Sequence, residues 1–219
     1  MENNSAVPIS SIDFPQITAK AKTGEEHFSQ NSEPLPITTL DFWRWSSSGF
    51  LDNTTRGILA EFIVASALNL TSSLRVEWNA FDLITPEQVR IEVKSAAYLQ
   101  SWQQKKVSTI RFSIASSYGW NADTNEISQI RKRSSDIYVF CLLIHKDKQT
   151  VNPLNMDQWI FYVLPTAQID QQVPGQKTLS LSRMQQIGAV QASYETLAET
   201  VNTVAHRYNL SQYREKISG

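Results

Sequence analysis

A continuous apolar run at residues 136–144, DIYVFCLLI, constrains the fold more than any other part of this 219-residue sequence. Its length suits a strand, and because side chains alternate across a strand, an apolar strand needs packing on both faces. The run therefore predicts the central strand of a sheet that is covered on each side. Cys141 within it is interpreted as a small buried hydrophobe, and a single cysteine excludes an intramolecular disulfide.

Hydrophobic periodicity predicts the other elements. Residues 55–69, TRGILAEFIVASALN, form the clearest helix, and apolar residues cover most of its circumference, so we expect it to be largely buried. Strands are predicted at 73–78, 80–84, 89–95, 107–114, 158–164 and 178–181, and further helices at 126–133 and 194–208. This order predicts an α/β fold of the α+β type, a mixed sheet flanked by helices, in a single domain at 39–219.

The N-terminal region differs from the rest in composition. Residues 1–38 are rich in Ser, Asn, Gln, Pro and Thr and lack a sustained apolar period, so we expect a polar arm with little structure of its own. The segment DFWRW, from Asp41, is aromatic. A helix beginning there would need a partner surface to bury its side chains.

Charge and hydropathy limit the class of protein. The net charge is −1, so no global field attracts the chain to nucleic acid or to a membrane. No apolar run approaches bilayer length, and the first residues do not resemble a signal peptide. The sequence predicts a cytoplasmic protein with no membrane partner. The three histidines are too scattered to form a zinc site, or a catalytic set with Cys141.

Residues 90–95, RIEVKS, combine strand alternation with charge. Arg90, Glu92 and Lys94 share one face, with Glu92 and Lys94 roughly 7 Å apart. The short turn at 85–88 makes the preceding strand an antiparallel neighbour, so we expect Asp82 to face Glu92. Two facing carboxylates repel unless a cation lies between them, and such oxygen ligands suit Mg²⁺. The simpler alternatives are a salt bridge on a surface strand and turn hydrogen bonds accepted by Asp82.

Glu61 is an acid in the most apolar helix of the sequence, between Ala60 and Phe62. A lone buried carboxylate is unfavourable unless it is neutral or paired. Glu61 is therefore expected to face the metal, its waters or a basic side chain, and an ion pair with Arg56 or Arg75 is the structural alternative.

These residues resemble a known superfamily. Glu61 in a helix, FD at 81–82 and EVK at 92–94 on the next strand are similar to the restriction-endonuclease-like superfamily, the PD-(D/E)xK nucleases. EVKS also resembles the version of the motif found in archaeal Holliday-junction resolvases. The resemblance covers roughly residues 55–145, and Phe81 stands where the motif name has proline.

The resemblance implies a role for each matching residue. Asp82 and Glu92 would bind Mg²⁺ or Mn²⁺, Glu61 would complete the metal site, and Lys94 would assist the attacking water and the charge developing on the phosphate. Some members of the superfamily carry a glutamine that orients the site or the substrate, and Gln103 or Gln104 would correspond to it.

Basic residues are concentrated near the motif. Residues 90–133 hold eight Lys or Arg and three Asp or Glu, a net of +5. This asymmetry predicts a nucleic-acid contact surface, because cations neutralise phosphates and exposed aromatic rings stack on unpaired bases. Its expected cations are Lys105, Lys106, Arg111, Arg131, Lys132 and Arg133, with Trp102, Tyr118 and Trp120 nearby in sequence. A solvated helix end and ordinary packing are the alternatives.

The sequence thus predicts a metal-dependent nuclease that hydrolyses phosphodiester bonds in DNA, in restriction, repair or defence. A homodimer would suit cleavage of both strands of a duplex. The alternative is a catalytically inactive module on the same fold that binds nucleic acid or a partner. A glycosidase with two carboxyl groups would leave Lys94 without a role.

Overall fold

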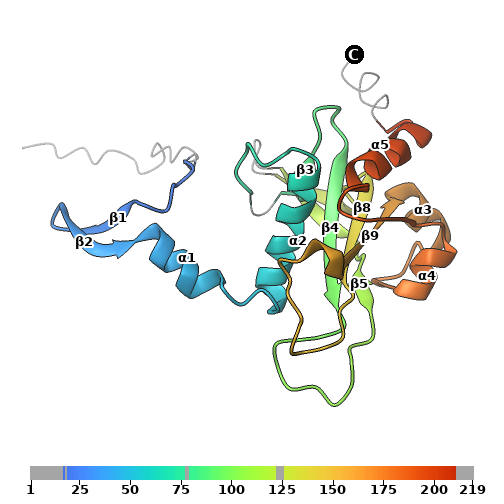
Figure 1. Ribbon diagram of the computed structural model, residues 1–219. Coiled ribbons are helices and arrows are strands. Elements are labelled where there is room, and N and C mark those ends of the chain that lie inside the picture. Colours follow the sequence, from blue (N-terminus) through green and yellow to red (C-terminus); the bar gives the residue numbers. More distant parts are fainter. Residues whose placement is uncertain (1–16, 18, 77–78, 122–125, 211–219) are drawn as a thin grey trace, which may run out of the picture.

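The computed structural model describes residue 17 and residues 19–76, 79–121 and 126–210. Its centre is a five-stranded mixed sheet in the order β11–β9–β8–β4–β3 (Figure 1). The middle strand is β8 (Ile137–Leu143), and all seven of its residues are buried. It runs parallel to β4 (Arg90–Ala97) and antiparallel to β9 (Trp159–Pro165). The central strand expected at 136–144 is confirmed.

The edges of this sheet are short strands. β3 (Leu83–Ile84) pairs with β4, and β11 (Val190–Ala192) pairs with β9, both antiparallel. Two small antiparallel sheets accompany it: β5 (Arg111–Ser113) with β10 (Thr178–Ser180), and β6 (Ser117–Asn121) with β7 (Glu126–Lys132).

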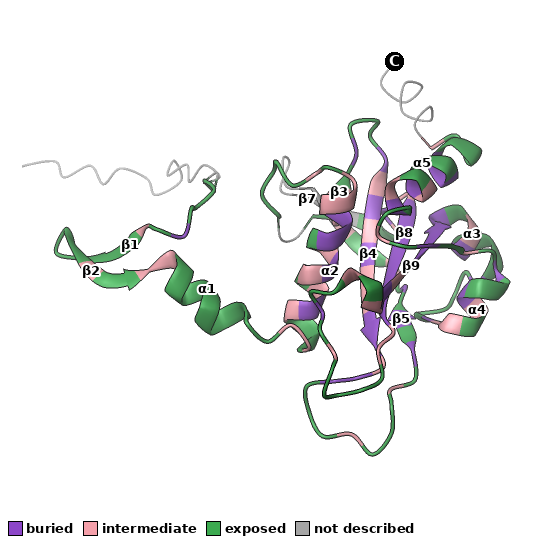
Figure 2. Cartoon of the chain, in the orientation of Figure 1, coloured by how far each residue is buried: buried purple, intermediate pink, exposed green. Residues whose placement is uncertain are grey.

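Alternation along β8 divides the core into two layers. Odd-numbered residues such as Val139 and Cys141 pack against the helices α2 (Asn53–Ala67) and α5 (Leu197–Arg207). Even-numbered residues such as Phe140 pack against β5, β10, α3 (Thr166–Gln172) and α4 (Leu181–Gln186). Figure 2 shows β8 and β9 buried between these layers. A 3₁₀ turn at Met156–Gln158 leads into β9.

This arrangement confirms the predicted α+β fold of a mixed sheet flanked by helices. The helix expected at 55–69 is α2, the closing helix is α5, and the strands expected at 158–164 and 178–181 are β9 and β10. None of the helices in the described ranges is long and apolar enough to cross a membrane.

The helix predicted at 126–133 is wrong, because most of this segment is strand β7. Its backbone pairs with β6, with Trp120 opposite Ile127 and an irregularity in register between Tyr118 and Trp120. The basic end of the expected helix is therefore one strand of a hairpin. The spacing of apolar residues within the segment favoured a helix, but pairing with β6 makes the segment a strand.

The strands predicted at 73–78 and 80–84 are shorter than expected. Residues 73–76 form no strand, positions 77–78 lie outside the described residues, and only Leu83–Ile84 pairs with β4. The backbone N–H of Val93 donates to the Asp82 carboxylate, so a side chain takes the place of a further ladder bond. The strand expected at 107–114 is likewise reduced to β5.

Helix α2 is less buried than its composition suggested. Ala60, Ile63 and Val64 face the sheet, but Ile58 and Phe62 remain 43% and 59% exposed. One side of the helix therefore presents apolar surface to solvent.

The N-terminal region has more structure than its composition indicated. Strands β1 (His27–Gln30) and β2 (Glu33–Thr38) form a hairpin that leads into helix α1 (Thr39–Ser47). Thr38 and Asp41 make a capping box, in which the Thr38 hydroxyl accepts from the Asp41 N–H and the Asp41 carboxylate accepts from the Thr38 N–H. This unit projects from the body (Figure 1).

A buried guanidinium fastens the start of α2. Arg56 is 4% exposed and donates to the carbonyl oxygen of Leu51, to Asn53 Oδ1 and to Gln100 Oε1 at 2.9, 2.7 and 3.2 Å. A fourth bond at 3.3 Å reaches Ser95 Oγ on β4. Burial lowers the pKa of Arg56 from its usual value. The helix is thus tied to β4 by hydrogen bonds as well as by apolar packing.

Replacing Arg56 with Met should lower the free energy of unfolding by about 2–4 kcal/mol. One buried acceptor and several partly buried ones would lose a donor, each at a cost of up to about 1–3 kcal/mol, while the Met side chain recovers some packing. Urea denaturation measures the change. Lys105→Met, at an exposed position, is the control and should change stability by less than about 0.5 kcal/mol. Equal stability of the Arg56 variant and the parent would show that this network contributes nothing net.

Candidate active site

The junction of β3 and β4 places two carboxylates at one cavity. Asp82 precedes β3, its backbone N–H donates to the Ile91 carbonyl, and its carboxylate accepts from the Val93 N–H at 2.7 Å. Glu92 lies on β4, and both acids line a polar cavity of about 250 Å³. The expected proximity of Asp82 and Glu92 is therefore present in the structure. Asp82 also accepts a local backbone hydrogen bond, which is the kind of role that the simpler interpretation of this residue predicted.

The electrostatics of Asp82 reflect its surroundings. Burial raises the pKa of this carboxyl, and the charge of Glu92 raises it further. The Val93 N–H, Lys94 and Arg75 act in the opposite direction, but the net direction is upward. The ionised carboxylate is therefore held where a further positive charge would stabilise it.

Lys94 neutralises Glu92. The two side chains project from the same face of β4 and form an ion pair between Lys94 Nζ and Glu92 Oε1, both largely shielded from solvent. Val89, Ile91 and Val93 are buried on the other face, so the predicted alternation is confirmed. The simpler interpretation expected a salt bridge to a neighbouring strand, whereas this ion pair joins two residues of β4 itself.

Glu61 is paired with Arg75. Two nitrogens of the guanidinium donate to the two oxygens of the carboxylate, with Arg75 Nη2 to Glu61 Oε1 at 3.2 Å. Arg56, the other expected partner, makes its bonds elsewhere. Glu61, Arg75 and Asp82 line a second, mainly apolar groove of about 360 Å³. Arg75 thus lies between the helix acid and the strand acid.

The carboxylates are not gathered into a three-ligand set. Within the described ranges, no group of three or more His, Cys, Asp or Glu side chains is arranged to hold a metal. Asp82 and Glu92 remain a pair of oxygen ligands at a polar cavity. Such a pair fits Mg²⁺, which takes one or two carboxylates together with waters and phosphate oxygens. Glu61 faces Arg75 and would have to turn to join them.

Two residues near the acids had no catalytic role assigned from the sequence, Tyr138 at the polar cavity and Arg75 at the adjacent groove. Tyr138 on β8 is the register partner of Glu92 and lines the cavity, and burial together with the Glu92 charge raises its pKa. The phenol therefore stays protonated as a hydrogen-bond donor. Arg75 was considered only as an ion-pair partner. Tyr138 could be assigned to the cavity only from the parallel pairing of β4 with β8. The sequence of either strand alone does not reveal that pairing.

The expected cations fall into separate groups. Arg133 lines the cavity, but its guanidinium is fixed by Asp170 and by the carbonyls of Ile114 and Gln176, so it is a stationary charge. Arg131 lies over the Tyr118 ring, 5.3 Å from its centroid. Lys132 on β7 and Arg111 on β5 are exposed. The side chain of Trp120 lies outside what the structure describes.

Gln104 has a structural role in the loop after β4. Its side chain accepts from the Gln100 N–H at 2.7 Å and donates to the Tyr98 carbonyl and to Ser108 Oγ. Gln104 does not line either cavity that contains Asp82. Four further predicted residues, Trp102, Gln103, Lys105 and Lys106, lie in the same loop, beyond the carboxyl end of β4 (Figure 1).

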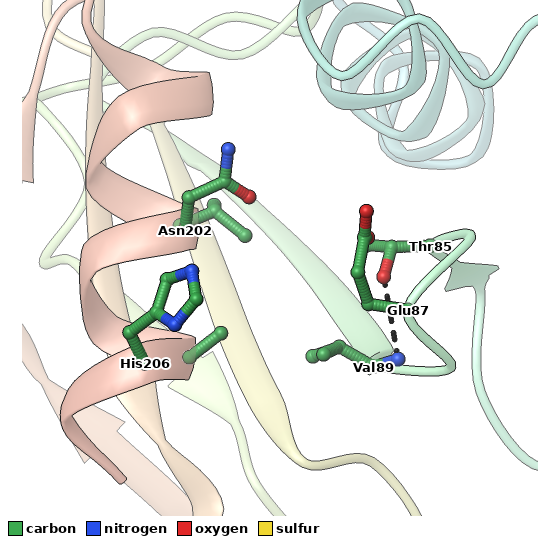
Figure 3. A pocket seen from close by; sticks show the side chains of 7 residues that line it. Thr85, Glu87, Val89, Asn202 and His206 are labelled. Carbon is green, nitrogen blue, oxygen red and sulfur yellow. Dashed lines mark hydrogen bonds between the residues drawn. The ribbon is translucent and has the colours of Figure 1, made fainter. Parts of the chain in front are cut away.

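A third cavity lies away from these acids. It is about 120 Å³ in volume and separates the turn before β4 from helix α5. Figure 3 shows Glu87 and Thr85 across from Asn202 and His206. One carboxylate and one imidazole line this cavity, without the paired carboxylates of the first cavity.

Fold and site together define a mixed α/β protein with two acids at a polar cavity and a lysine paired to one of them. Residues 42–183 match the family of bacteriophage T4 endonuclease IV. The match covers more than half of the 219 residues, so the chain belongs to this family of nucleases, which act on nucleic acid. The matched segment includes Glu61, Asp82, Glu92 and Lys94. No curated protein matches the chain.

Asp82→Asn should make the metal-free protein more stable at neutral pH. The folded-state pKa of Asp82 lies above its unfolded value, so the parent loses stability as pH rises between the two values. Asn avoids this loss, and its amide oxygen can still accept from Val93. We expect the melting temperature to rise by a few degrees, since 1 kcal/mol corresponds to about 2–4 °C in a chain of this size.

Calorimetry in a chelating buffer at acid and neutral pH measures this effect. The increase in melting temperature of Asp82→Asn over the parent should be small below the unfolded-state pKa of Asp82. It should reach its full size above the folded-state pKa. Asp157→Asn, at an exposed position, is the matched control and should show no such trend. A variant less stable than the parent at neutral pH would contradict the stated electrostatics of Asp82.

Proposed function

We propose that the protein is a metal-dependent deoxyribonuclease of the PD-(D/E)xK type, in which Asp82 and Glu92 bind Mg²⁺ or Mn²⁺. The observation that carries the proposal is the placement of these two carboxylates at one polar cavity, with Lys94 paired to Glu92, in a chain of an endonuclease family. The raised pKa of Asp82 supports it, because a cation would relieve the repulsion between the acids.

The chain's own residues would then act on a phosphodiester as follows. The Val93 N–H holds the Asp82 carboxylate in position. Lys94, now paired with Glu92, would turn to a non-bridging phosphate oxygen or to the attacking water and stabilise charge that develops in the transition state. The Tyr138 hydroxyl can donate to the substrate in the same cavity. A bound divalent cation supplies water activation and neutralises phosphate charge.

The proposed roles of Glu61 and Gln104 are less direct than those of Asp82, Glu92 and Lys94. Glu61 would complete the metal site once Arg75 leaves it for a substrate phosphate. Gln104 would act through the loop whose backbone it holds rather than at the phosphate.

The substrate in the proposal is DNA, cut in restriction, repair or defence inside the cytoplasm. Exposed cations would contact its phosphates, and Tyr118, 55% exposed with Arg131 over its ring, is placed to stack on a base. The proposed phosphate contacts are Lys105, Lys106, Arg111, Arg131, Lys132 and, as a fixed charge, Arg133. A homodimer would bring two sites to a duplex.

A second candidate is an inactive nucleic-acid-binding module on the same fold. The observation that favours it is that Glu92 and Glu61 already have cationic partners, Lys94 and Arg75, and so can be stable without a metal. Such a protein would bind DNA without cutting it and would have no affinity for Mn²⁺.

Lys94→Ala should reduce the rate of DNA cleavage about 10²–10³-fold, the usual effect of removing one group that stabilises the transition state. Supercoiled plasmid and circular single-stranded DNA, each with Mg²⁺, Mn²⁺ or chelator, are suitable substrates. Lys177→Ala removes an exposed lysine elsewhere and should cut at the parent rate. Cleavage by Lys94→Ala at the parent rate would refute the assignment, and binding without cleavage by the parent would support the inactive module.

A further inference from the structure

The projecting N-terminal unit exposes an unusual amount of apolar surface. We call β1, β2 and α1 together the arm. None of the residues of α1 is buried, and the arm is largely exposed in Figure 2. Its exposed large apolar side chains are Phe28, Ile37, Leu40, Phe42, Trp43 and Trp45. So many exposed large apolar side chains on one small unit indicate an interaction site.

The arm is too small to be stable by itself. A two-stranded hairpin and a helix of nine residues are each marginal in water. Internal packing brings Leu40 and Trp43 near Gly24. Phe42 and Trp45, one turn apart, lie on the opposite side of α1, and Trp45 is 84% exposed. A partner surface would supply the missing burial.

The linker directs the arm away from its own body. Between α1 and α2, the Asp52 N–H donates to the Gly49 carbonyl, and a side chain at Gly49 would meet Asp52 Oδ2 at 2.4 Å. The buried Arg56 holds the Leu51 carbonyl and Asn53. Folding back would require this turn to be remade, so another molecule is the better partner.

Charge decides the kind of partner. The arm, from residue 27 to residue 47, contains two acids, Glu33 and Asp41, and one base, Arg44, a net charge of −1. A single base offers no cationic surface for phosphate backbones or anionic membranes. The partner is therefore a protein with an apolar surface.

The body offers such a surface. The groove of about 360 Å³ between α2 and residues 70–84 is lined mainly by apolar side chains. Ile58, Phe62, Leu74, Val76 and Ile84 line it and are each at least 39% exposed. Asp82 borders both this groove and the polar cavity, so a segment docked here would form a wall beside the acids.

We propose that the arm of one copy docks through Phe42 and Trp45 into the α2 groove of a second copy, and that the exchange is reciprocal. Each chain carries both the convex apolar helix and the concave apolar groove, so two identical contacts close a two-fold dimer. The inference rests on the arm and the groove and is independent of the catalytic proposal.

Engineered disulfides test which copy the arm contacts. The only native cysteine, Cys141, is buried and will not compete. Trp45→Cys and Phe62→Cys, made in separate chains with tags of different size and mixed under mild oxidation, should give a covalent heterodimer. Trp102→Cys replaces Trp45→Cys in the control, because Trp102 is also an exposed tryptophan. This control should give no heterodimer with Phe62→Cys.

The second part of the test measures the mass in solution of proteins that carry no engineered cysteine. Light scattering should give twice the chain mass for the parent and for Trp102→Glu, and the mass of one chain for Trp45→Glu and for Phe62→Glu. Circular dichroism checks that each variant is folded. A monomeric parent would overturn the proposal, and so would a dimer that persists in both the Trp45→Glu and the Phe62→Glu variants. A third contradicting result concerns a chain that carries both Trp45→Cys and Phe62→Cys, if a disulfide forms only within that single chain.

Discussion

The pairing of β4 with its two neighbours is the constraint on which the rest of the structure depends. On one face of β4, Ile91 and Val93 are buried against α2 and the core. The other face must then carry Glu92 and Lys94, because side chains alternate along a strand. Pairing with β8 brings Tyr138 beside Glu92, and the Val93 N–H fixes the Asp82 carboxylate. A shift of one residue in this register would bury the charges and dismantle the cavity.

Charge balance explains how this cavity is tolerated in a folded protein. Glu92 and Glu61 each have a cationic partner, whereas Asp82 accepts a backbone hydrogen bond and feels the charges of Lys94 and Arg75. Acids kept close together at a stability cost are typical of functional sites. In the proposed function, a metal and a substrate phosphate would supply the charges that these groups lack.

Local patterns predicted much of the fold and part of the site. The apolar run at 136–144, the helix that became α2 and the alternation of β4 depend on nearest neighbours, and all three are confirmed. Asp82 and Glu92 were placed together because a short turn joins their segments. Long-range pairing decided the rest: β7 is a strand because β6 lies beside it, and Tyr138 reaches the cavity through the β4–β8 register. Gln104 could not be placed, because the bonds that fix it lie within an irregular loop.

Isothermal titration of Mn²⁺ into the metal-free protein tests the central claim most directly, with Asp82→Asn and Glu92→Gln in parallel. The account predicts saturable binding by the parent and its loss in both variants, while circular dichroism shows that all three remain folded. No binding by the parent, or equal binding by the variants, would contradict the claim that this pair of carboxylates holds the catalytic metal.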